Sequence, residues 1–182
     1  MMWNGNSWQM MTSPTSTDLL AIQLANSTNG WAGGGKGDNG VLLNLNGTNW
    51  TIWNRINLGG SVNSTNGYVT DSLNKPVNSI TMDTGVSAWA VGGNGTVLYW
   101  TGTEWDGQSG MAGGTNLRSV SMVHGTSTGS TQAWAVGDNG KIIAWTGAQW
   151  VPEVPIIMIV PLLLSIGLIV LFSKARLRRI GL

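Results

Sequence analysis

The chain has 182 residues, of which 27 are Gly, 11 are Trp and none is Cys, and its formal net charge at pH 7 is +1. The lack of Cys excludes disulfides, thiol catalysis and cysteine-ligated zinc, and no basic stripe suited to nucleic acid precedes the last residues. A charged fraction of only 9%, with Gly, Asn, Ser and Thr between short apolar runs, favours an all-β chain with many turns over a helical enzyme.

The chain opens on a segment that matches the end of a later repeat. Residues 3–8, from Trp3 to Trp8, have the same pattern as residues 145–150, from Trp145 to Trp150. The segment has no basic n-region and no apolar h-region, so it does not predict a signal peptide. By its pattern, the chain begins in the middle of a repeated unit.

Three full units follow, and each is predicted to contain four strands. The first strands, at residues 19–24, 77–82 and 117–122, alternate in hydropathy, and Ile22, Ile80 and Val120 align in them. Each second strand begins near a Trp and leads to an Asn-Gly pair, a strong hairpin signal because both central turn positions need a positive φ. These pairs lie at residues 39–40, 94–95 and 139–140, and each unit closes on Trp50, Trp105 or Trp150.

Four-stranded units of about 40–55 residues are typical of blades stacked around an axis. The Ala-Val-Gly-x-x-Gly hairpin before a Gly-x-x-Trp turn resembles the blades of BNR-like and photosystem II stability/assembly-factor-like β-propellers. The predicted fold is therefore a partial β-propeller over residues 1–150, with about three full blades and part of another. Because propellers need about four blades to close, the closing strands are expected to lie upstream or in an associated chain.

The segment between the first two units, residues 53–75, is predicted to be an extended surface loop because it is rich in Gly, Asn and Ser. Trp53 lies outside the repeated Trp positions and is predicted, with Arg55, to be an exposed ligand contact. The repeated tryptophans are instead expected to pack between neighbouring blades. Asn63 begins a glycosylation sequon and is the most plausible acceptor among several.

The sequence offers no convincing catalytic or metal site. Asp38 and Asp138 begin Asp-Asn-Gly sequences that are better interpreted as turns than as calcium loops, because further acidic ligands are missing. His124 is the only His, without the partners of a triad or a metal site. No two carboxylates are marked as a facing pair. We therefore expect a non-enzymatic protein without a cofactor or a metal.

The chain changes character after Trp150. Residues 151–155 form a Pro-rich linker, residues 156–173 are apolar enough to span a bilayer as a helix, and residues 174–182 form a basic tail. Lys174, Arg176, Arg178 and Arg179 predict a cytoplasmic C-terminus with the repeats outside.

The same region resembles a C-terminal sorting signal of the archaeal PEF-CTERM type or its bacterial PEP-CTERM counterpart. The motif residues are Pro152, Glu153 and Pro155, while Val154 stands where the PEF-CTERM motif has Phe. The resemblance implies a membrane sortase-like enzyme that removes the span, and the alternative is a retained anchor.

These features predict a surface-exposed, membrane-anchored or sortase-processed propeller protein that binds a protein or glycan partner or forms part of the cell envelope. One alternative is an assembly or stability factor for a membrane protein complex, and another is a propeller glycosidase or lyase fragment. A cytosolic tail-anchored protein is disfavoured because the basic tail would have to cross the membrane.

Overall fold

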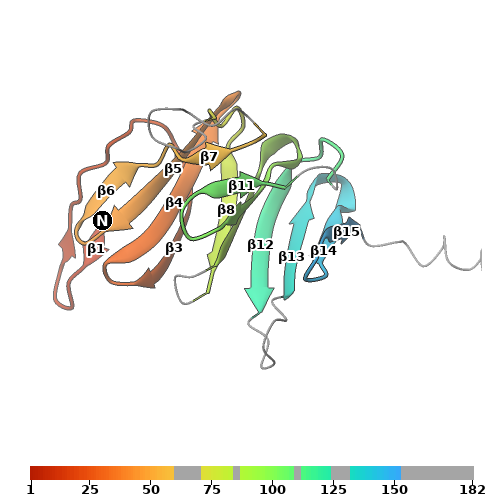
Figure 1. Cartoon of the computed structure of the whole chain (residues 1–182). Coiled ribbons are helices and arrows are strands. Elements are labelled where there is room, and N and C mark those ends of the chain that lie inside the picture. Colours follow the sequence, from red (N-terminus) through yellow and green to blue (C-terminus); the bar gives the residue numbers. More distant parts are fainter. Residues whose placement is uncertain (60–70, 84–86, 109–111, 124–131, 153–182) are drawn as a thin grey trace, which may run out of the picture. The chain divides into compact units, whose positions relative to one another are not determined.

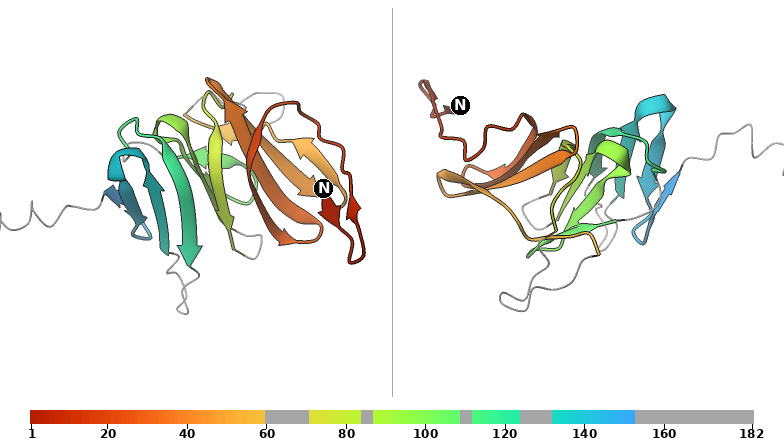
Figure 2. Two further views of the ribbon diagram at one scale, coloured as in Figure 1. Left: turned by 180° about the vertical axis from the view of Figure 1, so that it is seen from behind. Right: turned by 90° about the horizontal axis from the view of Figure 1, so that it is seen from above.

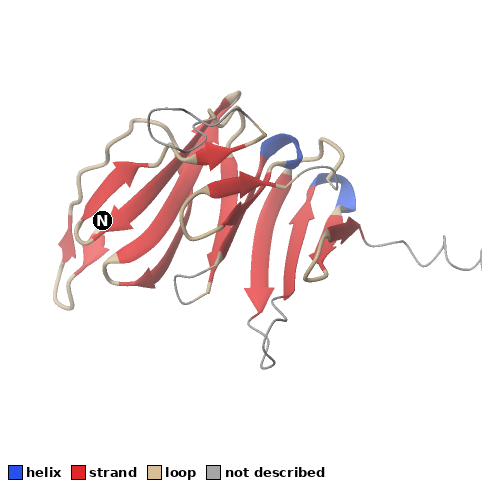
Figure 3. Ribbon diagram, viewed as in Figure 1, coloured by secondary structure: helices blue, strands red, loops and turns tan. Residues whose placement is uncertain are grey.

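The computed structural model describes residues 1–59, 71–83, 87–108, 112–123 and 132–152. These residues form three sequential blades, each with the four antiparallel strands that were predicted, and the middle sheet gains a fifth strand (Figures 1 and 3). Blade 1 comprises β3 (Leu19–Asn26), β4 (Asn29–Lys36), β5 (Asn39–Asn46) and β6 (Asn49–Ile52). Blade 2 comprises β8 (Val77–Met82), β9 (Ala88–Gly92), β10 (Val97–Trp100) and β11 (Trp105–Gly107). Blade 3 comprises β12 (Leu117–Val123), β13 (Gln132–Gly137), β14 (Ile142–Trp145) and β15 (Trp150–Pro152).

The blades follow one another in chain order, each facing the next (Figure 2). Their first strands lie side by side, because β8 contacts both β3 and β12. We call this side the inner edge. All of the described residues belong to one compact unit, Met1–Pro152.

A short hairpin precedes blade 1 and confirms that the first residues repeat the end of a unit. It consists of β1 (Met2–Trp3) and β2 (Trp8–Gln9), with Trp3 paired to Trp8. The same pairing joins Trp100 to Trp105 and Trp145 to Trp150. The described residues therefore form three full blades and the last two strands of a further one.

The Asn-Gly turns are confirmed in blades 2 and 3. Asn94 and Asn139 have φ of 52° and 58°, and Gly95 and Gly140 follow with φ of 74° and 69°. These turns form the short 3-10 elements η1 (Gly93–Gly95) and η2 (Asp138–Gly140).

The predicted turn at Asn39 and Gly40 is wrong, because both residues lie within β5. The first hairpin is longer, and its two-residue turn is Gly37 and Asp38, where Gly37 has a φ of 62°. The longer hairpin brings the N–H of Gly40 to the carbonyl of Leu73, which accepts a hydrogen bond at 2.9 Å. This contact ties the first hairpin to the segment that enters blade 2.

The prediction of a surface loop over residues 53–75 is also wrong at both of its described ends. Ile56 and Asn57 form β7 (Ile56–Asn57), which adds to the outer edge of blade 2 by pairing in parallel with β11. Ile56 and Leu73 are both buried in the core between blades 1 and 2. The segment is thus tied to the next blade by apolar side chains that its Gly- and Asn-rich composition obscured.

The core consists of two apolar layers, one between each pair of adjacent blades. In the first layer the ring of Trp31 lies 4.7 Å from that of Trp100 and 5.1 Å from that of Trp105. In the second layer Trp89 makes the equivalent contacts with Trp145 and Trp150, at 4.8 and 5.0 Å. These contacts confirm packing between blades for Trp31, Trp89, Trp100, Trp105, Trp145 and Trp150. Trp3, Trp8 and Trp134 hold the same repeat positions but are 53%, 64% and 45% exposed. The two layers show how each blade buries a face that it could not cover alone.

Within the described residues, no helix is long and apolar enough to cross a membrane. The predicted span at 156–173 and the basic residues Lys174, Arg176, Arg178 and Arg179 lie outside the described residues. Their membrane role stays a prediction.

Candidate functional site

Each first strand begins with a β-bulge at the same repeat position. In blade 2, Val77 pairs with Gly92 and Ser79 with Val91, so Asn78 is the extra residue. In blade 3 the extra residue is Arg118, and in blade 1 it is Leu20. Because a bulge re-aims the side chain that it carries, Asn78 and Arg118 both reach the same groove at the inner edge.

The turns after the second strands lie against the segments that enter the first strands. The N–H of Gly93 donates to the carbonyl of Pro76, and the N–H of Asp138 donates to the carbonyl of Asn116, both at 2.9 Å. The N–H of Gly35 makes the equivalent bond to Asp18 in blade 1, also at 2.9 Å. This repeated bond places each turn beside the start of its own blade.

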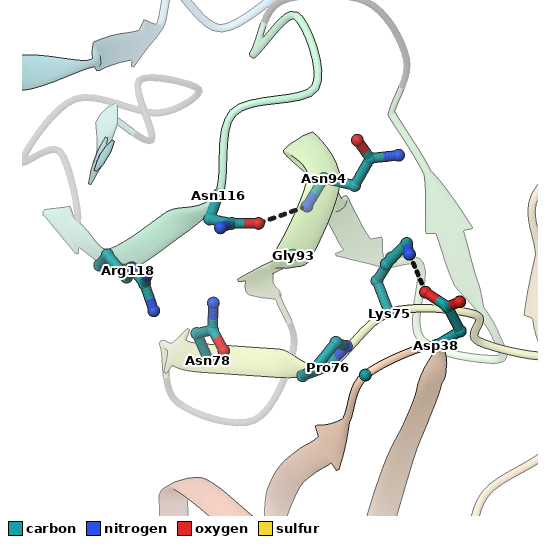
Figure 4. A pocket seen from close by; sticks show the side chains of 9 residues that line it. Asp38, Lys75, Pro76, Asn78, Gly93, Asn94, Asn116 and Arg118 are labelled. Carbon is teal, nitrogen blue, oxygen red and sulfur yellow. Dashed lines mark hydrogen bonds and ion pairs between the residues drawn. The ribbon is translucent and has the colours of Figure 1, made fainter. Parts of the chain in front are cut away.

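Together the bulges and turns border an open groove of about 500 Å³ that draws residues from all three blades (Figure 4). Blade 1 contributes the turn with Asp38, blade 2 contributes Asn78 and Asn94, and blade 3 contributes Arg118. The groove is lined by Gly37, Asp38, Lys75, Pro76, Asn78, Gly93, Asn94, Asn116 and Arg118.

Hydrogen bonds between blades fix the polar side chains of the groove. The side-chain amide of Asn78 donates to the carbonyl of Leu117 at 2.7 Å. The side-chain oxygen of Asn116 accepts the N–H of Asn94 at 2.9 Å (Figure 4). Each bond joins blade 2 to the start of blade 3, so the groove is held by more than one blade.

The two cations of the groove are both ion-paired. Lys75 contacts the carboxylate of Asp38 across the border of blades 1 and 2. Arg118 donates from Nε and from its terminal amino group to the two oxygens of Asp138, at 2.7 and 2.9 Å. This bidentate geometry is the stronger form of such a contact. The pairs leave the groove close to neutral.

The ion pairs lower the pKa of both carboxyl groups. The pKa of Asp138 lies below its ordinary value of 3.8, chiefly because Arg118 and then Asn116 donate hydrogen bonds to the carboxylate. The pKa of Asp38 is lowered by the hydrogen bond and the positive charge of Lys75.

We expect the carboxyl of Asp138 to stay ionised below pH 3.8 in the folded protein. A pKa that is lower in the folded than in the unfolded state stabilises the fold fully above the ordinary value, and this contribution is lost as the pH falls through the lowered value. NMR of the side-chain carboxyl carbon measures the titration, in which Arg118→Ala and Asn116→Ala should each move the pKa back up.

The matched control is Asn94→Ala, because Asn94 bonds Asn116 through its backbone N–H. This variant should leave the pKa of Asp138 unchanged. A titration of Asp138 at or above 3.8 in the unaltered protein would contradict the assignment.

The predicted ligand contact, Trp53 and Arg55, lies elsewhere, on the outer side of the first core layer. Trp53 is half-buried, with its ring 5.2 Å from Trp31 and 5.4 Å from Trp100. Its indole N–H donates to the carbonyl of Arg55 at 3.1 Å, and the guanidinium of Arg55 lies 5.5 Å from the ring centre. The predicted exposure of Trp53 is therefore wrong, because its ring extends the packing between blades 1 and 2. Ligand binding by Trp53 and Arg55 stays a prediction.

The remaining predicted site residues fall mostly outside the described residues. Asn63, Glu153, Pro155 and His124 all do, and Pro152 is the last residue of β15. The part of the chain that the structure describes holds no group of three or more His, Cys, Asp or Glu residues placed to bind a metal ion.

Sequence reasoning missed the groove residues Asn78, Asn116 and Arg118. The available signal was the alignment of Leu20, Asn78 and Arg118 just after the first apolar residue of each first strand. That alignment gave no sign of the bulges, which depend on pairing with the neighbouring strand.

The described architecture is that of a partial β-propeller, and comparison with solved structures agrees. The chain is similar in fold to the structure of YCF48 bound to a D1 peptide, with a TM-score of 0.57 and 19% sequence identity over 82% of this chain. The match spans 45% of the YCF48 chain, so this chain corresponds to less than half of it. No protein-family model and no curated protein matches the chain.

Proposed function

We propose that this protein is a non-catalytic binding protein that holds an extended segment of a partner protein in the inner-edge groove. The observation that carries the proposal is the convergence of repeat-equivalent bulges and turns from three blades on one polar groove. A surface that spans several blades suits an elongated ligand better than a compact one.

The chemistry of the groove favours a peptide main chain. The amide side chains of Asn78, Asn94 and Asn116 offer both donors and acceptors, which match the N–H and C=O groups of an extended strand. Because Lys75 and Arg118 are already ion-paired, the groove does not demand a highly charged ligand. None of its lining residues is aromatic, and this disfavours a glycan bound by stacking.

We further propose that the protein acts at a membrane. The apolar residues 156–173 and the basic tail support an anchor with the blades outside and the C-terminus cytoplasmic. Processing at the motif Pro152, Glu153 and Pro155 by a sortase-like enzyme is the variant of this proposal in which the anchor is removed and the protein remains at the cell surface.

An assembly or stability factor for a membrane complex is the second candidate. The similarity in fold to YCF48, whose structure contains a bound D1 peptide, supports this candidate. The support is limited to the fold, because a shared fold does not determine which ligand is bound. The two candidates share peptide binding, and they differ in whether the partner is part of a membrane complex.

A random-peptide library displayed on phage, selected on the full chain in detergent, tests the proposal. We expect enriched peptides whose affinity falls at least about tenfold, equal to about 1.4 kcal/mol, in the double variant Asn78→Ala/Arg118→Ala. The control is Gln149→Ala, an exposed change in the turn between β14 and β15. Peptides that bind both variants equally would refute the groove, and selection of glycans instead of peptides on an array would favour the carbohydrate alternative.

A further inference from the structure

Several Asn-x-Thr sequons lie in the described blades, and the structure separates one of them from the others. Asn26, Ser27 and Thr28 form the end of the hairpin between β3 and β4, where Asn26 pairs with Asn29 across a two-residue turn. All three residues of this sequon are exposed. Because a glycan acceptor must be accessible at the surface, the sequon of Asn26 meets the first condition for modification.

The side chain of Asn26 is held in an Asx-turn. Its Oδ1 accepts a hydrogen bond from the backbone N–H of Thr28 at 2.9 Å and another from the hydroxyl of Thr28 at 3.0 Å. Because a backbone N–H can only donate, Oδ1 must be the side-chain atom that faces Thr28. Neither bond uses Nδ2, which is the atom that carries the glycan in N-linked glycosylation.

The two bonds to Oδ1 favour the chemistry of glycan transfer. A carboxamide nitrogen is a poor nucleophile, because its lone pair is delocalised onto the oxygen. As Nδ2 loses its proton, negative charge develops on Oδ1, and the two donors of Thr28 already lie where that charge forms. The turn therefore stabilises the reactive form of the Asn26 side chain.

The other described sequons lack this arrangement. The hydroxyls of Thr51 and Thr96 donate to backbone carbonyls, at 3.5 and 2.7 Å, rather than to the Asn side chain of their own sequon. In the sequon that begins at Asn46, no hydrogen bond between described atoms joins the side chains of Asn46 and Thr48. Asn63 lies outside the described residues. The structure thus distinguishes sequons that the sequence alone could not rank.

The sequon of Asn26 is also well separated from the inner-edge groove. β4 begins at Asn29, beside Asn26, and runs to the turn that carries Asp38 in the groove, so the two sites lie at opposite ends of one strand (Figure 1). Asn26 and Thr28 do not border the cavity that blade 1 and the N-terminal hairpin line together. Their exposure therefore does not arise from that face of blade 1, and a glycan here leaves the groove open.

We infer that Asn26, presented by its Asx-turn, is an acceptor for N-linked glycosylation from a polyprenyl-pyrophosphate-linked oligosaccharide. In the transfer, Nδ2 of Asn26 forms a bond to C1 of the first sugar, and the bond from C1 to the pyrophosphate oxygen breaks. The lipid pyrophosphate leaves with the electron pair, and the proton of Nδ2 passes to a carboxylate of the transferase. The inference rests on the blades lying outside the membrane, as proposed above, because the lipid-linked donor is presented on that side.

Transfer in vitro tests the acceptor apart from the placement of the blades. The full chain, purified in detergent from a host without N-linked glycosylation, is incubated with a single-subunit oligosaccharyltransferase and a lipid-linked oligosaccharide. Mass spectrometry then measures the occupancy of each sequon. We expect Asn26 to be occupied at least about fivefold faster than Asn46, Asn49 or Asn94, because its side chain is already held in the reactive arrangement.

Short peptides that carry the same sequons are the control for local sequence. They should lose most of the preference for Asn26, because no hairpin holds the Asx-turn in them. In the full chain, Ser27→Ala keeps the sequon and should leave the rate unchanged, whereas Thr28→Val removes the hydroxyl and should abolish transfer. Faster use of another described sequon, or an equal preference for Asn26 in the peptides, would overturn the inference.

The protein isolated from its own membranes completes the test, and occupancy of Asn26 there supports both the acceptor and the placement of the blades. Labelling of the exposed Lys36 on intact cells, with an amine reagent that does not cross membranes, separates the two ways of failing. Protein that is labelled but carries no glycan overturns the acceptor and leaves the placement outside the membrane standing. Protein that is not labelled overturns the placement, and the inference falls with it.

Discussion

Replacing Trp89 by alanine is expected to lower the free energy of unfolding by about 3–5 kcal/mol, whereas the same replacement at Trp134 should cost about 1 kcal/mol or less. The two residues hold one repeat position and differ in burial: Trp89 is 1% exposed and Trp134 is 45% exposed. Trp89 contacts rings of the next blade as well as Tyr99. Its removal leaves a large cavity between two sheets that cannot easily collapse, while Trp134 lies on an uncovered face.

The role of Trp89 is packing rather than hydrogen bonding. Its indole Nε1 is buried and has no hydrogen-bond partner among the described residues. Trp89→Phe, which keeps an aromatic ring and discards only that N–H and part of the volume, should therefore lose clearly less stability than Trp89→Ala.

Urea unfolding of the full chain in detergent, followed by circular dichroism of the β-sheets, measures these differences. Equal losses for Trp89→Ala and Trp134→Ala would contradict the arrangement of blades, because burial would then not distinguish the two positions. A biphasic transition would also be informative, since repeat units can unfold in parts.

The repeat architecture could be predicted because its signals are local and occur three times. Alternating first strands, aligned tryptophans and Asn-Gly turns gave the strands of blades 2 and 3 almost completely. The predicted turn of blade 1 was wrong for a specific reason. Gly33, Gly34 and Gly35 allow β4 to continue to Lys36, and Gly37 provides the positive φ that a turn at residues 37–38 needs.

The candidate site could not be predicted, because it depends on contacts between distant residues. The bulges at Asn78 and Arg118 arise from strand pairing, and the groove exists only where the turn of one blade meets the first strand of another. The predicted exposure of Trp53 was wrong for the same reason. It stands outside the repeat in sequence, yet it joins Trp31 and Trp100 in the layer between blades.

Gly92 lies so close to the backbone of Pro76, beside the groove, that it leaves no room for a side chain. We expect Gly92→Ala to destabilise the protein by about 1–3 kcal/mol, the usual cost of forcing extra volume into a packed site. An added Cβ would lie 1.9 Å from the carbonyl oxygen of Pro76. The φ of Gly92 is −163°, an extended value that alanine adopts freely, so the loss comes from the collision alone.

The collision should also reach the groove, because the carbonyl of Pro76 accepts the N–H of Gly93. Moving that carbonyl away breaks the bond and shifts the start of β8, which carries Asn78. Gly93→Ala is the matched control, since the three nearest atoms to its Cβ would all belong to side chains: those of Pro76 and Lys75 at 3.2 and 3.3 Å, and Asn116 Oδ1 at 3.7 Å. Urea unfolding should separate the two variants clearly, and peptide affinity should fall for Gly92→Ala even under conditions where it is fully folded. If Gly93→Ala is as damaging as Gly92→Ala, the close approach of the Pro76 carbonyl does not control the stability of this turn.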